Sequence, residues 1–103
     1  SCNDSINTRI HEFVTAERSI LYQNYPNPFS ETTHIKYHLN EHSKVKIEVF
    51  DLYGKKRAVL VDEPKLPGIY SFVFDGREFG EGVFFYVLET DKSYHVKKLQ
   101  IVR

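Results

Sequence analysis

The sequence predicts an all-β fold in which two antiparallel sheets pack face to face. Apolar and polar residues alternate with period two in several short segments, and turn-forming residues separate these segments. Aromatic residues make up 15% of the chain, and all of them are Phe or Tyr. Alternation places successive side chains on opposite faces of a strand, and wide aromatic rings pack well on a pleated sheet. These observations disfavour a helical fold.

The character of the chain changes near Ser19. Residues 1 to 18 are largely polar, and their scattered apolar residues would support only one weak helical turn. We therefore interpret residues 1 to 18 as a linker or the end of a preceding domain. Residues 19 to 103 are expected to form a single β-sandwich domain, because this length suits one hydrophobic core.

The first part of the expected domain contains three strands and a stiff corner. Ile20 to Tyr22 can form a short strand. Pro26 and Pro28 then keep the chain extended, because a residue before proline avoids helical backbone angles. Residues 34 to 39 and residues 44 to 49 alternate polar and apolar side chains, which predicts two half-buried strands.

A hairpin and a loop are expected next. The segment Asp51 to Lys55 predicts a tight turn in which Gly54 is free to adopt positive φ. Arg57 to Val61 can form the returning strand. Asp62 to Gly68 contains two prolines and a glycine, so we expect a loop there that ends the pairing.

Three further strands complete the prediction. Aromatic and aliphatic residues share one face of residues 70 to 74 and of residues 84 to 88. Tyr94 to Val102 forms the last strand, where a change of phase in the apolar positions predicts a bulge near Lys97 and Lys98. Seven short strands separated by turns are typical of an immunoglobulin-like or fibronectin-like sandwich.

Composition excludes several classes of partner and function. The 14 basic and 14 acidic side chains cancel, so no net charge would draw the domain to nucleic acid or to an anionic membrane. No apolar stretch approaches the ~20 residues that span a bilayer, and we expect no membrane span. The single cysteine, Cys2, excludes an intrachain disulfide.

No residue pattern predicts catalysis, a metal or a cofactor, and we expect that the domain is not an enzyme. His34 and His38 would point outward from a strand ~13 Å apart, too far to share one metal ion, and we expect exposed histidines there and at His42. Cys2 has no nearby histidine that could act as its base. The aspartates at turns, including Asp51 and Asp75, are expected to have structural roles.

Outward-facing aromatic residues leave a binding function open. Tyr53, Phe79, Phe85 and Tyr94 could form a strip for sugar or peptide, although such residues more often cover a sheet edge. The final strand is a second candidate, because an edge strand offers unpaired backbone groups to a receptor.

From Leu21 to Arg103 the sequence resembles a type A C-terminal sorting domain of the type IX secretion system of Bacteroidetes. The matching motifs are Gln23 to Phe29, Thr32 to Tyr37, Val49 to Lys55, Gly68 to Tyr70, Asp75 and Gly76, Gly82 to Tyr86, and Lys97 to Leu99. Phe74 stands where the family commonly has Trp. The pattern is also similar to the immunoglobulin-like domain of flagellar hook-capping proteins.

The resemblance implies a folded signal on an exported protein. An outer-membrane translocon would recognise the domain after export to the periplasm, and an attached upstream cargo would reach the cell surface or the medium. A surface sortase-like peptidase would then remove the domain. The resemblance places recognition on Gly82, Tyr86, Lys97, Lys98 and Arg103. It assigns maintenance of the fold to Pro26, Pro28, Phe29, Asp51, Gly54, Gly68, Tyr70, Asp75 and Gly76.

Two alternatives remain open from the sequence. One is an accessory module that binds carbohydrate or protein for an extracellular enzyme, and the other is a structural module like that of the hook cap. Loss of polysaccharide binding on replacing exposed aromatics would favour the first, and self-association would favour the second.

Overall fold

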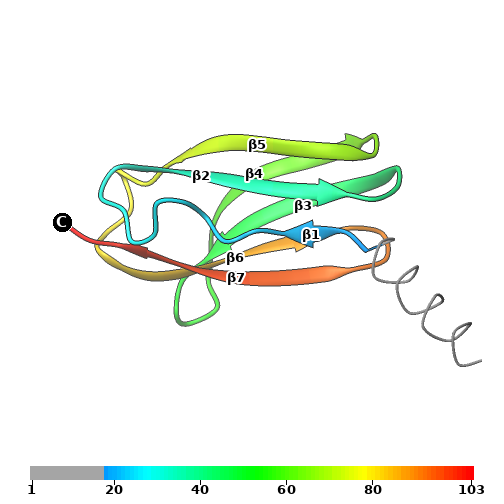
Figure 1. The fold of residues 1–103 in the computed structure, drawn as a ribbon. Helices are drawn as coiled ribbons and strands as arrows, with labels where there is room; N and C mark the ends of the chain where they lie inside the picture. The colour runs from blue at the N-terminus through cyan, green and yellow to red at the C-terminus, as the bar shows by residue number, and fades with distance from the viewer. Residues whose placement is uncertain (1–17) are drawn as a thin grey trace, which may run out of the picture.

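Residues 18 to 103 form a sandwich of two antiparallel sheets in a computed structural model, which describes these residues (Figure 1). The expected all-β, seven-stranded fold is confirmed. The strands are β1 (Ile20–Leu21), β2 (Thr32–Leu39), β3 (Ser43–Phe50), β4 (Lys56–Lys65), β5 (Gly68–Asp75), β6 (Gly82–Glu89) and β7 (Tyr94–Ile101).

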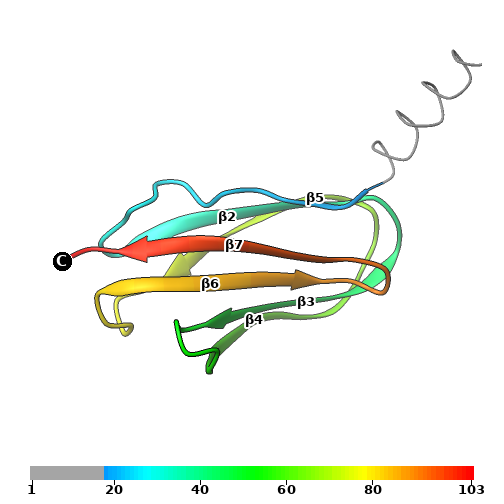
Figure 2. The same ribbon diagram turned by 90° about the horizontal axis from the view of Figure 1, so that it is seen from below.

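The strands divide into a three-stranded sheet with the order β1-β2-β5 and a four-stranded sheet with the order β4-β3-β6-β7. The views from two sides show the sheets as separate layers, with β1 and β7 next to each other at one margin (Figures 1 and 2). Strand β7 therefore lies at the edge of its sheet, next to β6. The chain changes sheet between β1-β2 and β3-β4, and again on either side of β5.

The alternation of apolar and polar residues in the sequence correctly predicts which residues form the core. The inward residues of β2 and β3, such as Ile35, Tyr37 and Ile47, are fully buried, whereas their neighbours are exposed or half-buried except for Glu48, which is 9% exposed. Tyr37 stacks on Tyr70 of β5 with ring centroids 5.2 Å apart, which joins β2 to its partner strand. Residues 18 to 103 contain no cysteine and no group of side chains that could hold a metal ion, and apolar side chains pack together between the two layers.

The turn between β3 and β4 follows the sequence prediction. The Asp51 carboxylate accepts hydrogen bonds from the backbone N–H groups of Tyr53 and Lys55, at 2.9 Å and 3.0 Å. Gly54 has a φ of 83°, a backbone conformation that side-chain-bearing residues rarely adopt. Asp51 and Gly54 therefore fix the shape of this hairpin.

The expected loop from Asp62 to Gly68 is wrong. Strand β4 continues through Pro64, which lies opposite Lys44 of β3, and only Leu66 and Pro67 separate β4 from β5. Strand β4 is an edge strand, and an edge strand tolerates proline because the missing N–H can face away from the sheet.

The bulge expected near Lys97 and Lys98 is also wrong. Strands β6 and β7 pair without interruption from Gly82 opposite Ile101 to Glu89 opposite Tyr94. The register shifts instead lie between β3 and β4, after Ile47 and after Val49. The change of apolar phase in β7 arises because Val96 lies on the outer face of the sheet and is 48% exposed, whereas Leu99 faces the core.

Candidate functional site

The second half of the β7 edge is covered by the segment Gln23–Phe29, and we call this segment the corner. The Phe29 N–H donates to the Gln100 carbonyl at 3.0 Å, and the Val102 N–H donates to the Phe29 carbonyl at 2.9 Å. Asn27 and Gln23 add side-chain bonds to the Gln100 N–H and the Lys98 carbonyl, at 2.9 Å and 2.6 Å.

The corner leaves a shorter part of the β7 edge accessible than the sequence predicted. From Lys98 to Val102, β7 or its extension has partners on both sides, β6 on one and the corner on the other. Among residues 18 to 103, the backbone groups of Tyr94 and Val96 that point away from β6 have no partner, and both residues lie in the first half of β7. A receptor strand pairing with the whole length of β7 would have to displace the corner.

Tyr86, an expected recognition residue, is buried in the core and holds the corner in place. Its hydroxyl accepts a hydrogen bond from the Asn24 N–H and donates one to the Tyr22 carbonyl, both at 2.8 Å. Burial raises the pKa of Tyr86 to about 12, so the hydroxyl keeps its proton at physiological pH. Because the side chain is fully covered, a protein docking on the folded domain would not touch it.

Sequence reasoning missed a second buried polar pair beneath the corner. The Asn24 amide donates to the Thr33 hydroxyl at 3.0 Å, and that hydroxyl donates to the Pro26 carbonyl at 2.7 Å. Both side chains are buried, at 2% and 0% exposure. Thr33 shares the inward face of β2 with Ile35, Tyr37 and Leu39, and this period-two position was the signal that could have revealed it.

Arg103 binds the backbone of the loop after β5. Its guanidinium donates to the carbonyls of Gly76 and Phe79 at 3.0 Å and 2.5 Å, and it also contacts the carbonyls of Ser30 and Arg77. This side chain therefore ties the last residue to two neighbouring loops. The planar guanidinium offers several fixed donors, which suits one side chain to several carbonyl acceptors.

Phe29 and Gly76 form the packed end of the corner. Phe29 is 3% exposed and meets Phe74 edge to face at 6.2 Å between ring centroids. A Cβ added at Gly76 would lie 3.0 Å from Phe29 Cε2 and 3.1 Å from Ile101 Cδ1. A side chain at position 76 would therefore make Phe29 or Ile101 shift by a few tenths of an ångström.

Most of the other residues expected to maintain the fold lie at turns and strand ends, whereas Tyr70 is half-buried within β5. Pro26 and Pro28 lie in the exposed part of the corner. Gly68 has a φ of 153° at the start of β5, and the Tyr70 hydroxyl donates to the Leu66 carbonyl at 2.6 Å. Asp75 binds the Arg77 guanidinium at 2.6 Å, and this contact lowers the pKa of Asp75 to about 2.

The three remaining expected recognition residues have different exposures. Lys98 is exposed on the outer face of β7, and Lys97 is half-buried beside β1. Gly82 starts β6 with a φ of 145°, so a side chain there would strain the backbone although it would meet no neighbour within 4 Å. The structure thus brings Gly82, Tyr86, Lys97 and Lys98 to the paired strands β6 and β7.

The outward aromatic strip that the sequence left open forms only in part, since Phe85 and Tyr94 border one surface. Tyr53 and Tyr94 are 95% and 68% exposed, but Phe79 packs between Phe74 and Phe84 with both centroid distances at 5.3 Å. Phe85 is half-buried on the outer face of the four-stranded sheet. Tyr53 lies in the turn after β3, whereas Tyr94 begins β7.

The described residues form no group of three or more side chains that could hold a metal ion. His34 and His42 are exposed and His38 is half-buried. Cys2 lies outside the described residues. Between residues 18 and 103, no helix has the length and hydropathy needed to cross a bilayer.

Comparison with known proteins identifies the class of domain. Residues 23–102 match the family described as "Secretion system C-terminal sorting domain". The chain belongs to this family, whose members are C-terminal sorting signals for type IX secretion. A search of curated proteins finds no match.

The family match confirms the resemblance drawn from the sequence, and it establishes the function of the domain. The domain directs export across the outer membrane to the cell surface or the medium, and it acts with the type IX machinery on an attached cargo. The family is a non-catalytic one.

Proposed function

We propose that the type IX translocon in the outer membrane recognises the folded domain at the β6-β7 end of the four-stranded sheet, with Lys98 as a direct contact. Lys98 is exposed there, next to the corner. An exposed ammonium can pair with an acidic group of a receptor without disturbing the core. The exposure of Lys98 beside the covered edge is the observation that carries this proposal.

The other recognition candidates act as positioning residues in this proposal. Tyr86 holds the corner through two hydrogen bonds, and Arg103 ties the chain end to the loop after β5. Gly82 supplies the backbone conformation that starts β6. Replacing any of these residues would alter the surface around Lys98 without removing a contact to the receptor. Lys97 is half-buried and contributes positive charge beside β1.

The proposal extends to the fate of the protein. The chain works as a carried signal and not as an enzyme, an upstream cargo domain is its passenger, and a surface sortase-like peptidase removes it after export. The family membership supports this sequence of events.

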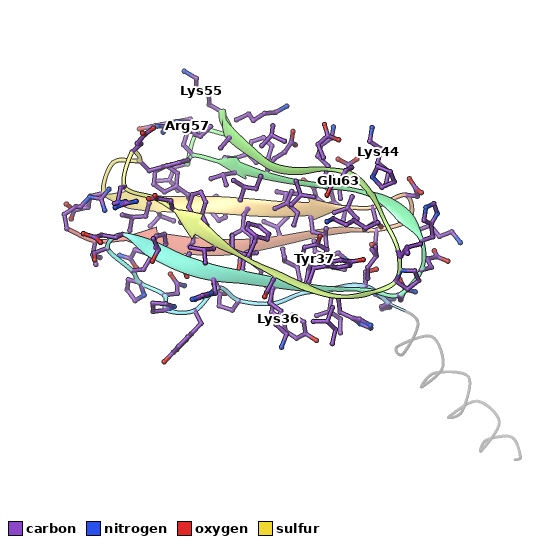
Figure 3. The ribbon with its side chains drawn as sticks, turned by 90° about the horizontal axis from the view of Figure 1, so that it is seen from above. Lys36, Tyr37, Lys44, Lys55, Arg57 and Glu63 are labelled. Atoms are coloured by element: carbon purple, nitrogen blue, oxygen red, sulfur yellow. The ribbon has the colours of Figure 1, made fainter. Side chains whose placement is uncertain are left out.

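A charge reversal tests the contact at Lys98. The full chain is fused behind a reporter that is exported to the periplasm of a bacterium with a type IX system. We expect Lys98→Glu to move the reporter from the medium to the periplasm by about tenfold, because attraction becomes repulsion. The matched control is Lys55→Glu, since Lys55 is exposed in the turn between β3 and β4 and its side chain points away from the sandwich (Figure 3). Normal secretion of Lys98→Glu contradicts the proposal.

A further inference from the structure

A shallow groove lies between β1 and the first half of β7, away from Lys98 and the corner. Its volume is about 480 Å³, within the range of ~300–1,000 Å³ that ligand pockets occupy. Residues 18 to 21 form one wall and residues 94 to 97 form the other. The two strands lie next to each other in both side views (Figures 1 and 2). The open part of the β7 edge therefore borders a recess.

The backbone along this recess offers free hydrogen-bonding groups. Backbone groups alternate in direction along a strand, so those of Tyr94 and Val96 point to the same side as those of Gln100. Gln100 is bonded to the corner on that side, whereas Tyr94 and Val96 have no such bond to any described residue. An extended segment placed there would find unpaired donors and acceptors on β7.

The two faces of β7 along this edge differ in chemistry. On the outer face, Tyr94 and Val96 are 68% and 48% exposed and border an apolar surface that includes Phe50, Phe85 and Val87. On the groove face, the side chains are those of His95 and Lys97. Successive side chains of an added strand would therefore meet an apolar face and a basic face in turn.

The described residues that line the groove include two cations, Arg18 and Lys97, and no carboxylate. Glu41 lines the adjoining recess with Arg18 and His95, and there it pairs with Lys92 at 3.3 Å. Burial lowers the pKa of His95, and the positive charges of Arg18 and Lys97 lower it further. The Nε2 atom of His95 is buried and has no hydrogen-bond partner among the described residues. This local charge favours an anionic ligand although the whole chain has no net charge.

We propose that this groove binds an extended segment of a partner protein in which acidic and apolar side chains alternate. The segment lies along the free edge from Tyr94 to Val96, with its apolar side chains against the outer face and its carboxylates toward Arg18 and Lys97. This surface is a second interaction site, distinct from the contact proposed at Lys98.

Neither residues 1 to 17 nor the open edge strands supply such a segment, which favours an occupant from outside residues 1 to 103. The open edge strand β4 has its two acidic residues side by side, at Asp62 and Glu63. The open edge strand β5 has one acidic residue, Asp75, at its end. Residues 1 to 17 contain three acidic residues, at positions 4, 12 and 17, which do not alternate with apolar ones.

Binding of a synthetic peptide of alternating glutamate and valine to the full chain tests the proposal. We expect binding by calorimetry, with affinity reduced about tenfold by Arg18→Glu because the charge is reversed. Val96→Pro removes the free N–H without touching the ladder to β6, and Val96→Asn removes an apolar contact on the outer face without adding a charge. Both are expected to reduce affinity, whereas Val73→Asn, at an exposed position on β5, leaves it unchanged.

A further readout comes from His95. A carboxylate in the groove raises the pKa of this histidine, so its NMR titration should move to higher pH when the peptide is bound. An equal affinity for a peptide of alternating lysine and valine contradicts the proposal, as does the absence of binding. Self-association that Val96→Pro abolishes would assign the groove to a second copy. Binding that requires deletion of residues 1 to 17 would assign it to that segment, and each of these results overturns the proposed partner.

The experiment is independent of the Lys98 contact. The variants that weaken the peptide leave Lys98 in place, and Lys98→Glu leaves Arg18 and the β1 wall of the groove intact. Peptide binding without an effect of Lys98→Glu on secretion would support the groove and contradict the recognition site. Absence of peptide binding together with an effect of Lys98→Glu on secretion would support the recognition site and contradict the groove.

Discussion

The Tyr86 hydroxyl accepts a hydrogen bond from the Asn24 backbone N–H at 2.8 Å, which joins the middle of β6 to the corner. The corner in turn covers the second half of the β7 edge. One buried side chain therefore controls which part of the last strand is open. A sorting domain that must meet a translocon without aggregating with other copies benefits from such a covered edge.

Tyr86→Phe removes the hydroxyl and keeps the ring. We expect the free energy of unfolding to fall by ~1–3 kcal/mol, because the buried Asn24 N–H loses its partner and the Tyr22 carbonyl loses a donor. Urea denaturation of the chain measures this change. Tyr94→Phe is the matched control, since Tyr94 is 68% exposed. Equal losses of stability in the two variants would contradict a stabilising role for the hydrogen bonds of the Tyr86 hydroxyl.

Gly76→Ala places a methyl group against the packed end of the corner. The new Cβ would lie about 3 Å from Phe29 Cε2, so we expect a loss of ~1–3 kcal/mol in the free energy of unfolding. Gly80→Ala is the control, because a Cβ at Gly80 meets nothing within 4 Å and its backbone is not in the left-handed region. Thermal unfolding distinguishes the two, and an unchanged midpoint for Gly76→Ala would be evidence against this close contact.

Arg103→Ala releases the loop after β5 from the end of the chain. The guanidinium donates to four carbonyls, and its loss is expected to cost ~1–2 kcal/mol because these bonds are partly exposed. Arg103→Lys is expected to recover only part of this stability, since one ammonium cannot match several carbonyls at once. Hydrogen exchange at residues 76 to 79 reports the release. Full recovery by lysine would show that charge alone matters at this position.

The pair of Asp75 and Arg77 predicts a change of stability in acid. Arg77 lowers the pKa of Asp75 from 3.8 to about 2 in the folded protein, so the unfolded chain binds this proton first as the pH falls. The stabilisation is present above about pH 4 and is lost between about pH 4 and pH 2. We expect the difference in melting temperature between wild type and Asp75→Asn to shrink through this range. A constant difference would exclude the linkage.

The fold was predictable from the sequence because strand periodicity is a local property. Inward residues such as Ile35 and Val45 could be assigned from alternation alone, and the turn at Asp51 and Gly54 follows from backbone chemistry. The continuation of β4 through Pro64 could not be predicted, because the tolerance of proline depends on the position of the strand at the sheet edge.

The candidate site was less predictable because it depends on contacts between distant segments. Tyr86 has the pattern of a core residue, but its bonds to Tyr22 and Asn24 cross more than sixty positions of the chain. The covering of β7 by Phe29 is equally remote in sequence. The apolar phase change in β7 was visible, but a bulge and an apolar outer face give the same pattern. The uninterrupted register of β6 and β7 shows that the apolar outer face is the correct explanation.

Secretion of a fused reporter tests the central claim most directly. A reporter exported to the periplasm is joined to the full chain, or to a chain lacking Lys98 to Arg103, in a bacterium with a type IX system. We predict that the full chain brings the reporter to the medium or the cell surface, and that the shortened chain leaves it in the periplasm. The same distribution of reporter with both chains would contradict the assignment of sorting information to this end of the folded domain.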